Sequence, residues 1–544
     1  MLRGQYLATI GIAGLLWGSA AEAWAQAADE PVPMVQQLRA SVGPMRTAAA
    51  FGDATADQAR AFYAARGFRP AWNRPETVSA FVAALYTLGD DGLAPSAYGA
   101  DRLEAAYRRA YAVQRDVSAR VRFDRVATRV YLSVLGDLNR GKVDPDLLKP
   151  AWGLSVERYR PDPDRLSQAL DALDFERVFT NARPSYAAYQ RLRAGLARYR
   201  EIQRRGGWPQ IPARPAALHP GDRDPAIAGL RQRLAAIGEP VAISDTPDVY
   251  DRTLAEAVRR FQRDHYLDTD AVVGARTRAA LNVGVGARID QIRVNLERAR
   301  LLMHALPQSF VLVDIAGYQL SYYRPNGRIW RTRIVVGKPY RRTPSLRSRI
   351  THLNLNPPWT VPYSIVRREM LPRIRRDPSY LARESLHVLT PAGRRLDPKR
   401  IDWQHPPSIV LRQEAGPNNA LGRVVFRFAN PYSVYLHDTP AKTLFNQPRR
   451  AFSHGCIRVQ NALEFARLLL DDAQQWNAVA LQRAVATGQT RRVNLARPVP
   501  VIVHYWTVNV AKDGGLAFKP DIYRRDYAMR EALDRRLAVL NRLP

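Results

Sequence analysis

The single cysteine of this 544-residue chain, Cys456, is the side chain with the clearest capacity for chemistry. It closes the stretch Ser453-His454-Gly455-Cys456 and lies nineteen positions after His437. A lone thiol can form neither an internal disulfide nor a multi-cysteine metal site. A thiolate supplied by a neighbouring imidazole is instead a strong nucleophile toward carbonyl carbon. The alternative, a free cysteine buried as a small hydrophobe, is disfavoured by the polar neighbours on both sides.

The residues around Cys456 indicate how a covalent reaction would be supported. His437 and His454 are both candidates for the general base, but His454, two residues away on an extended chain, is not aimed at the sulfur. The backbone N–H groups of His454, Gly455 and Cys456 can converge on an oxyanion, because Gly455 permits a tight turn. Loss of one such donor typically costs ~10²–10³ in turnover. Arg458 either orients this turn or pairs with a substrate carboxylate, and the sequence leaves both roles open.

The elements that must position these residues are strands. Apolar residues alternate with period two through 308–365 and 420–508, with a hairpin turn at Pro325-Asn326-Gly327. We therefore expect a mostly β catalytic domain over residues 308–510. An arginine-rich insertion with a helical pattern, residues 367–413, interrupts it, and such insertions often act as lids. We expect a mobile cap over the Cys456 cleft; a fixed surface elaboration is the alternative.

The remainder of the chain has helical periodicity, and at about 150 residues per domain it holds three or more domains. Residues 29–205 predict a helical scaffold domain, and a Pro-rich linker follows at 208–220. Residues 285–306 predict a helix that rejoins this scaffold. Residues 511–544 predict a C-terminal helical extension, and its basic segment from Asp521 to Leu543 is expected to pack on the catalytic domain.

A compact module over residues 221–283 resembles the small three-helix peptidoglycan-binding domain. The resemblance rests on Leu230 to Gly238, on Ala257-Val258 with Phe261-Gln262, and on Val273-Gly274 with Thr277 and Leu281. The pattern departs from that family at Asp268 to Ala271, where Asp-Gly is usual. Glycan binding and a generic three-helix packing unit both stay open for this module.

The first residues are typical of an export signal. Arg3 precedes an apolar run from Tyr6 to Trp17, and Ala-x-Ala sites follow up to Ala27. We expect a signal peptide over residues 1–27 and a periplasmic location; an uncleaved N-terminal anchor is the alternative. The apolar run is shorter than the ~20 residues that a membrane span needs.

The net charge of +32 indicates a partner of opposite charge. Seven of the 82 basic residues are lysines and the remaining 75 are arginines. Nucleic acid is the wrong partner for an exported chain, and no zinc finger, helix-turn-helix or RNP-like motif is found. Anionic lipid and cell-wall polymers remain as partner classes, although genomic composition also contributes to an arginine bias.

The sequence around Cys456 resembles that of the L,D-transpeptidases, and in particular that of their large multidomain periplasmic subgroup in Gram-negative bacteria. The motif Ser453-His454-Gly455-Cys456-Ile457-Arg458 with His437 upstream is the most specific part. Residues 336–344, 356–362 and 430–440 match as well. The resemblance covers essentially the whole mature chain. It implies a multidomain α+β protein with a helical scaffold, a three-helix peptidoglycan-binding module and a mostly β catalytic domain carrying a helical capping insertion.

The same resemblance implies the reaction and its participants. Cys456 would be the nucleophile and His437 the base, with Ser453, His454 and Gly455 forming the oxyanion loop. Arg458 would contact substrate, while Tyr435 and Trp359 resemble positions that line the donor cleft, with ordinary core packing as the alternative. A tetrapeptide stem would lose its terminal D-Ala to a Cys456 thioester, and a diaminopimelate amine would then form a 3→3 cross-link. Such an enzyme would be a carbapenem target.

Other functions are compatible with parts of this sequence pattern. Water as the acceptor gives an L,D-carboxypeptidase, and a lipoprotein lysine gives an anchoring enzyme. A non-catalytic cell-wall-binding protein and a protein-hydrolysing cysteine peptidase are the rivals, and the spacing around Cys456 does not resemble that of papain-like enzymes. No metal or cofactor is expected, since a thiolate attacks without one and Asp268 with Asp270 are too few for a calcium loop. Peptidoglycan stem peptides and glycan are the expected partners; contact with inner-membrane cell-wall synthases and the oligomeric state stay open.

Overall fold

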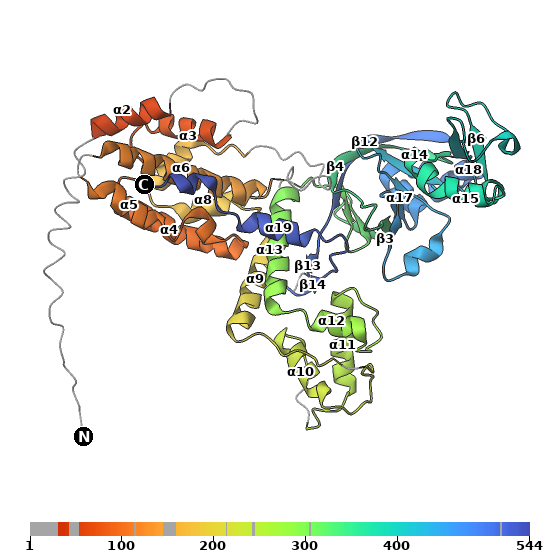
Figure 1. Cartoon of the computed structure of the whole chain (residues 1–544), viewed down its shortest axis with the longest axis horizontal. Helices are drawn as coiled ribbons and strands as arrows, with labels where there is room; N and C mark the ends of the chain where they lie inside the picture. Colours follow the sequence, from red (N-terminus) through yellow and green to blue (C-terminus); the bar gives the residue numbers. More distant parts are fainter. Residues whose placement is uncertain are drawn as a thin grey trace. The chain divides into compact units, whose positions relative to one another are not determined.

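The computed structural model describes residues 31–42, 54–113, 116–144, 159–213, 215–241, 245–303, 306–511 and 514–544 (Figure 1). The predicted signal peptide, residues 1–27, lies outside this range. Contacts divide the chain into two compact units, one made of Met1–Lys142, Glu157–Ser185 and Ala532–Pro544, the other of Val143–Val156 and Tyr186–Glu531. Among the described residues, no helix combines the length and the apolar character that crossing a membrane requires.

The first unit is helical throughout its described part, as the sequence predicts. The helix α6 (Val117–Arg140) is central and contacts α2, α3, α5 and α8. Aromatic rings fill the space beside it, with Trp72 stacked on Phe175 at 6.1 Å between ring centroids. The remaining elements are α2 (Pro31–Ser41), α3 (Ala54–Ala65), α4 (Pro75–Thr87), η2 (Leu88–Asp91), η3 (Pro95–Tyr98), α5 (Leu103–Ala112), α7 (Pro163–Asp171) and α8 (Phe175–Ala182).

The C-terminal end differs from the prediction that the whole segment from Asp521 to Leu543 packs on the catalytic domain. The chain from Ala532 onward belongs to the helical first unit, where η8 (Ala538–Arg542) packs on α6. Leu540 is buried there, and the missing side chain of Gly99 makes room for it, since a Cβ would lie 2.7 Å from the leucine. The N–H of Leu537 also donates to the carbonyl of Ala97 at 3.0 Å. The sequence pattern of a short amphipathic segment does not indicate which distant residue its apolar side chains will contact.

The second unit contains the predicted three-helix module. Its helices are α10 (Ala226–Ala236), α11 (Arg252–Asp264) and α12 (Ala275–Leu281), and the Asp251 carboxylate caps α11 by accepting from the Leu254 N–H at 2.8 Å. Leucines, Val258 and Phe261 form a core of its own. The module contacts the hairpin of β13 (Val508–Val510) and β14 (Leu516–Phe518), where His265 stacks on Phe518 at 5.8 Å between ring centroids.

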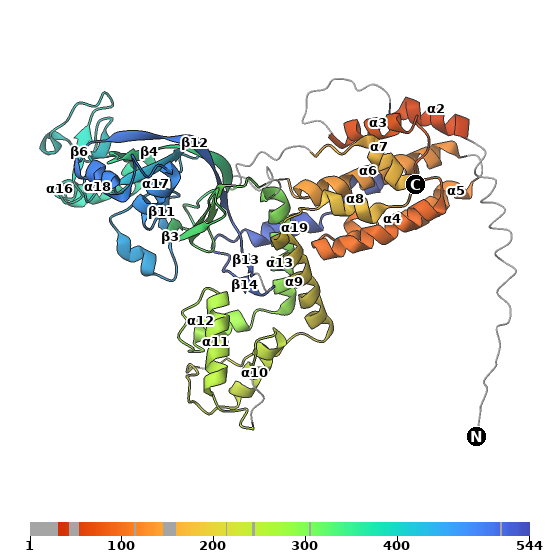
Figure 2. The ribbon, with the colours of Figure 1, turned by 180° about the vertical axis from the view of Figure 1, so that it is seen from behind.

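Two helices pack side by side next to that hairpin in the second unit. They are α9 (Ala187–Arg204) and α13 (Val285–Leu302), which lie together in Figures 1 and 2. Tyr189, Leu196 and Ile292 are among the apolar residues between them. Arg300 forms a buried ion pair with Glu297 at 2.7 Å and also donates to the Tyr189 hydroxyl, so both buried charges have partners.

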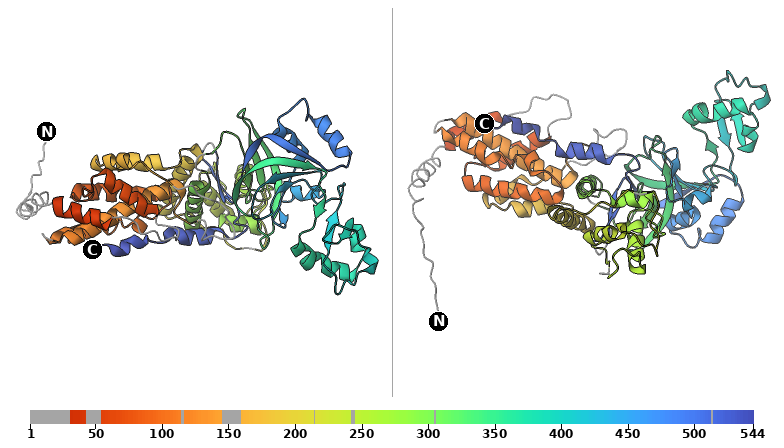
Figure 3. Two further views of the ribbon diagram at one scale, coloured as in Figure 1. Left: turned by 90° about the horizontal axis from the view of Figure 1, so that it is seen from above. Right: turned by 60° about the horizontal axis from the view of Figure 1, so that its bottom comes forward.

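The region predicted to be a mostly β catalytic domain is rich in strands, and the structure shows that they form a closed ring (Figure 3). The strands follow the order β10-β3-β11-β9-β8-β4-β12-β1-β2, and a further β2–β3 pairing closes the ring. The strands are β1 (Phe310–Asp314), β2 (Gln319–Tyr323), β3 (Ile329–Gly337), β4 (Leu346–Leu355), β8 (Val424–Phe428), β9 (Leu436–His437), β10 (Ala451–Ser453), β11 (Ile457–Val459) and β12 (Arg491–His504). The helix α17 (Ala462–Leu470) adds Phe465 to the core; η7 (Lys442–Asn446) and α18 (Ala478–Ala486) complete the region.

The insertion contains the helices predicted for the cap over residues 367–413, but it is a small domain of mixed structure because it also has a sheet. It contains α14 (Tyr363–Ile365), a π-helical turn η5 (Val366–Met370), α15 (Leu371–Arg376), α16 (Tyr380–Arg383) and η6 (Pro398–Arg400). It also contains a three-stranded sheet of β5 (Trp359–Thr360), β7 (Val410–Gln413) and β6 (Leu386–Leu389). Because β5 belongs to this sheet, the inserted domain begins at Trp359, and we call residues 359–413 the cap.

Candidate active site

Strand register brings the predicted residues to one face. β11 pairs in parallel with β9, so that Ile457 lies opposite Leu436 and Arg458 opposite His437. Ile457 and Leu436 are fully buried in the barrel core. Because side chains alternate along a strand, the residues on either side of these two point to the other face. Cys456, Arg458, Tyr435 and His437 therefore share that face and are neighbours or diagonal neighbours on it.

His437 is held in the tautomer that a base requires. Its Nδ1 lies 2.5 Å from the carbonyl oxygen of Asp438, which can only accept, so Nδ1 carries the proton. The lone pair is then on Nε2. Burial of the ring, together with the cation of Arg458, lowers the pKa of His437 from 6.5 to about 4. The imidazole is neutral at pH 7 and can accept a proton.

The thiol is neutral in the resting structure as well. Cys456 is half-buried, and desolvation raises its pKa above the ordinary value, against hydrogen bonding from Tyr435 and the cations of Arg427 and Arg458. The thiol donates to the Ser433 carbonyl oxygen, which lies 3.9 Å from the sulfur. A neutral thiol on the same face as a neutral imidazole supports proton transfer during attack rather than a permanent ion pair.

The turn before the thiol is built by Ser453 and Gly455. Ser453 Oγ donates to the Cys456 carbonyl at 2.5 Å and accepts from the Gly455 N–H at 3.2 Å. Gly455 has φ +116°, a conformation that side chains disfavour. This differs from the expectation of three converging donors, because the Gly455 N–H is already used. Among the described residues, the N–H groups of His454 and Cys456 have no acceptor, and these two stay available for an oxyanion.

A loop over residues 338–345 supports the turn from behind. The Lys338 N–H donates to the Ser453 carbonyl at 2.9 Å, and Thr343 Oγ1 donates to the Gly455 carbonyl at 2.9 Å. Thr343 Oγ1 also accepts from the Gly337 N–H at 2.9 Å. A Cβ on Gly337 would lie 2.0 Å from the Arg341 carbonyl oxygen, so only glycine allows the loop to fold back so closely. Thr343 thus connects the loop to the catalytic turn.

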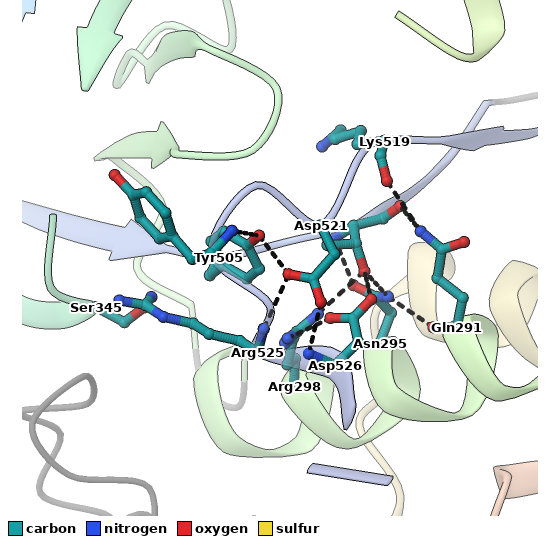
Figure 4. A network of polar contacts seen from close by, with 11 residues as sticks. Gln291, Asn295, Arg298, Ser345, Tyr505, Lys519, Asp521, Arg525 and Asp526 are labelled. Carbon is teal, nitrogen blue, oxygen red and sulfur yellow. Dashed lines mark hydrogen bonds and ion pairs between the residues drawn. The ribbon is translucent and has the colours of Figure 1, made fainter. Parts of the chain in front are cut away.

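The segment after the barrel holds this loop in turn. Tyr523 Oη donates to the Gly337 carbonyl at 2.6 Å, and the Arg525 guanidinium donates to the Thr343 carbonyl at 3.1 Å. Burial lowers the pKa of Arg525 to about 10. Asp521, shown in Figure 4, accepts from the Tyr505 hydroxyl at 2.6 Å and from the Arg525 N–H at 2.9 Å. The sequence prediction missed all of these residues.

The polar network continues to α13. Arg298 lies 2.7 Å from Asp526, and Asn295 accepts from the Thr507 N–H at 2.8 Å (Figure 4). Gln291 donates to the carbonyls of Thr507 and Lys519 at 3.0 Å each. Through these contacts, α13 is connected to the segment that holds the loop behind the thiol.

We expect Thr343→Val to reduce turnover and stability together. The substitution conserves volume but leaves the Gly337 N–H and the Gly455 carbonyl without their buried partner, which costs about 1–3 kcal/mol for each unsatisfied group. Urea unfolding and single-turnover acylation of Cys456 would measure the two effects. Thr351→Val, at an exposed threonine of β4, is the matched control. Unchanged acylation in a folded Thr343→Val protein would contradict the supporting role of this loop.

The other predicted residues fall in two places. Arg458 is largely buried beside His437, its pKa is lowered by that burial, and its Nε has no hydrogen-bond partner among the described residues. Tyr435 lies at the site, its pKa raised to about 12 by burial, and its ring is covered by Arg427 at 4.5 Å, a neighbour that sequence reasoning missed. Trp359 instead packs with the hydrophobic core of the cap.

His454 also contacts the cap. Its Nε2 lies 2.7 Å from Glu369 Oε1 in the π-helical turn. The ring is therefore engaged by a carboxylate, consistent with the preference for His437 as the base. No sequence signal marks Glu369, which lies 85 positions before its partner.

Three stretches of the chain match known domain families. Residues 57–196 match "Scaffold domain", residues 223–281 match "Putative peptidoglycan binding domain", and residues 308–508 match "L,D-transpeptidase catalytic domain". A Haemophilus influenzae protein named "Putative L,D-transpeptidase" is 32% identical over 239 residues, which are 43% of this chain and 48% of that protein. The match thus spans about half of the relative's length. These findings confirm the resemblance stated from the sequence.

A solved structure was also found to be similar. It is the crystal structure of an L,D-transpeptidase from Xylanimonas cellulosilytica, 15% identical, with a TM-score of 0.18, covering 54% of this chain and 100% of that chain. That score is too low to transfer any structural detail.

Proposed function

We propose that this chain, which carries an L,D-transpeptidase catalytic domain beside a scaffold domain and a peptidoglycan-binding domain, forms 3→3 cross-links in peptidoglycan through a Cys456 thioester. The observation that carries the proposal is the shared face of β11 and β9. There, the thiol shares a face with a buried imidazole whose Nδ1 is engaged by a carbonyl, which leaves the lone pair on Nε2.

In the first half-reaction, the Cys456 sulfur attacks the carbonyl that precedes the terminal D-Ala of a tetrapeptide stem. His437 Nε2 takes the thiol proton as the C–S bond forms. The oxyanion is stabilised by the N–H groups of His454 and Cys456. The C–N bond then breaks, His437 returns the proton to the leaving amine, and D-Ala departs from a thioester.

In the second half-reaction, an amine of a neighbouring diaminopimelate attacks the thioester carbonyl. His437 takes a proton from the amine, the C–S bond breaks, and the thiol is restored with that proton. Arg458 and Arg427 lie close to the sulfur and supply positive charge where a stem carboxylate would approach. Water in place of the amine gives the tripeptide, which is the carboxypeptidase alternative.

The setting of this reaction follows from the rest of the chain. A signal peptide over residues 1–27 would deliver the enzyme to the periplasm. The three-helix module would raise the local concentration of the enzyme on the sacculus, since a second weak contact acts as effective concentration. The net charge of +32 favours the anionic wall polymer.

Product analysis tests the proposal. The chain from residue 28 onward would be incubated with a disaccharide-tetrapeptide, and products would be identified by mass spectrometry. We expect a cross-linked dimer that has lost one D-Ala, and a carbapenem adduct on Cys456. Tripeptide alone would establish a carboxypeptidase. Neither product nor adduct, from folded protein that still binds sacculi, would establish a non-catalytic wall-binding protein.

A further inference from the structure

The cap is a domain in its own right within the second unit. Its sheet of β5, β7 and β6 shares no strand with the barrel (Figure 3). It has a separate core, in which Ile374 and Leu411 are fully buried beside Val388 and Met370. A body with its own core and its own sheet keeps its fold when its contacts to the barrel change.

An asparagine orders the chain at each end of the cap, and the one before β5 contacts α18 of the barrel region. The Asn356 side chain, before β5, donates to the Val485 carbonyl at 3.0 Å, and the Asn356 backbone N–H donates to the Arg423 carbonyl at 2.9 Å. It has φ +46°, which places the bend at this residue. Asn419, after β7, is buried, donates to the Glu414 carbonyl at 2.9 Å and accepts from the Leu421 N–H at 2.8 Å. The roots of the cap are therefore held in place.

Between these roots, one side-chain contact connects the cap to the catalytic turn in the described structure. It is the pair of Glu369 Oε1 and His454 Nε2 at 2.7 Å. Both side chains are about one-third exposed, so the contact can open without unfolding a core. Glu369 lies in a π-helical turn, and such turns are frequent at functional sites.

The partner of this contact is one of the groups on which the reaction depends. His454 supplies one of the two N–H groups that remain for the oxyanion, because Ser453 Oγ occupies that of Gly455. The hydrogen bond to Glu369 anchors the His454 ring and so limits the movement of the Cα next to the donor N–H. The position of Glu369 is therefore transmitted through the His454 ring to the direction of an oxyanion donor.

We propose that Glu369 is a positioning residue which couples the cap to the oxyanion turn, so that transition-state stabilisation is complete only while the cap contacts His454. The inference rests on the proposed function. It predicts that loss of the carboxylate lowers kcat and leaves KM nearly unchanged, because the affected interaction is made in the transition state.

The first experiment compares three variants of the full secreted chain. Glu369→Ala should slow acylation of Cys456 by a carbapenem about tenfold, less than the ~10²–10³ for outright removal of an oxyanion donor. Glu369→Gln keeps an acceptor oxygen for His454 and should restore most of the rate. Glu384→Ala is the control, since it removes an exposed carboxylate of the same cap and should behave as wild type.

A double-mutant cycle shows whether the two residues act as one unit. His454→Ala and Glu369→Ala together should be no slower than the slower single variant, because both break the same contact. Multiplying effects would mean independent roles and would overturn the proposal. Equal acylation by Glu369→Ala and wild type would also overturn it, while leaving the proposed transpeptidase intact.

Hydrogen exchange gives a readout that does not depend on catalysis. In Glu369→Ala, the peptide over residues 452–457 should exchange severalfold faster than in wild type and in Glu384→Ala. If wild type reacts with neither tetrapeptide nor carbapenem, the proposed function fails, and this exchange result alone decides whether the cap and the turn are coupled. Unchanged exchange would overturn the coupling.

Discussion

Cys456→Ala and His437→Ala are each expected to lower transpeptidation by at least ~10³, and the double variant should be no worse than either, because members of one nucleophilic unit are not additive. Cys456 provides the only thiol in the chain. His437 provides the Nε2 lone pair, because the Asp438 carbonyl engages the Nδ1 proton. Rates on a purified tetrapeptide, followed by mass spectrometry, would measure the loss. His454→Ala should remain folded and keep partial activity.

The protonation states of Cys456 and His437 also predict how the reactivity of the thiol depends on pH. A pKa of about 4 for His437 and a raised pKa for Cys456 mean that the resting pair is uncharged at pH 7. Alkylation of Cys456 by iodoacetamide should therefore be slow at pH 7 and should accelerate as pH rises past the ordinary thiol range. Removing the imidazole should change this alkylation little while abolishing turnover. Full turnover in His437→Ala would transfer the base role to His454 or disprove the mechanism.

The fold could be predicted where one face of each element is buried. Helical spacing in the first unit and period-two alternation in the barrel both report an apolar face directed at a core. The cap was misjudged because its strands β6 and β7 span only four residues each, which is too short for an alternation to be seen. The C-terminal end packs on the helical first unit through a contact of Leu540 with Gly99. No local sequence pattern predicts a contact between residues so far apart in the chain.

Within the candidate site, only the residues that take part in bond making and proton transfer could be predicted from the sequence. Cys456 and His437 are marked by residue type and by a specific motif, and strand pairing then places them on one face. Their supports come from distant segments: Tyr523 and Arg525 lie far beyond the motif, and Glu369 lies far before it. Each is one ordinary residue whose role exists only after the chain has folded. Trp359 shows the reverse case, an aromatic residue that packs in the cap.

Acid is expected to destabilise the second unit strongly between pH 6.5 and 4, because histidines are buried there in their neutral form. Burial lowers the pKa of His504 from 6.5 to about 4, as it does for His437, and lowers that of His265 well below its ordinary range. In the unfolded chain these rings take up protons near pH 6.5, whereas the folded chain does not. The unfolded state therefore gains protons first, and the free energy of unfolding falls as pH falls.

His504 allows this effect to be isolated. Neither of its ring nitrogens has a hydrogen-bond partner among the described residues, and the ring meets Trp506 edge-on at 5.6 Å. The groups facing it are Asp314, which favours the charged ring, and Lys519 with Arg298, which oppose it. A fall in pKa from 6.5 to about 4 corresponds to about 3 kcal/mol once pH is below both values, and to about 2 kcal/mol at pH 5.

His504→Phe should therefore unfold with a weaker dependence on pH than wild type. At pH 7.5 the variant should be as stable as wild type or more stable, because an unpartnered polar ring is replaced by an apolar one. At pH 5 it should exceed wild type by about 2 kcal/mol more than at pH 7.5, measured by urea unfolding at both values. His405→Phe, at an exposed histidine of the cap, should leave the difference between the two pH values unchanged. If His504→Phe and wild type lose the same free energy of unfolding between pH 7.5 and 5, the ring is charged in the fold. In that case the acid sensitivity of the second unit must come from other groups.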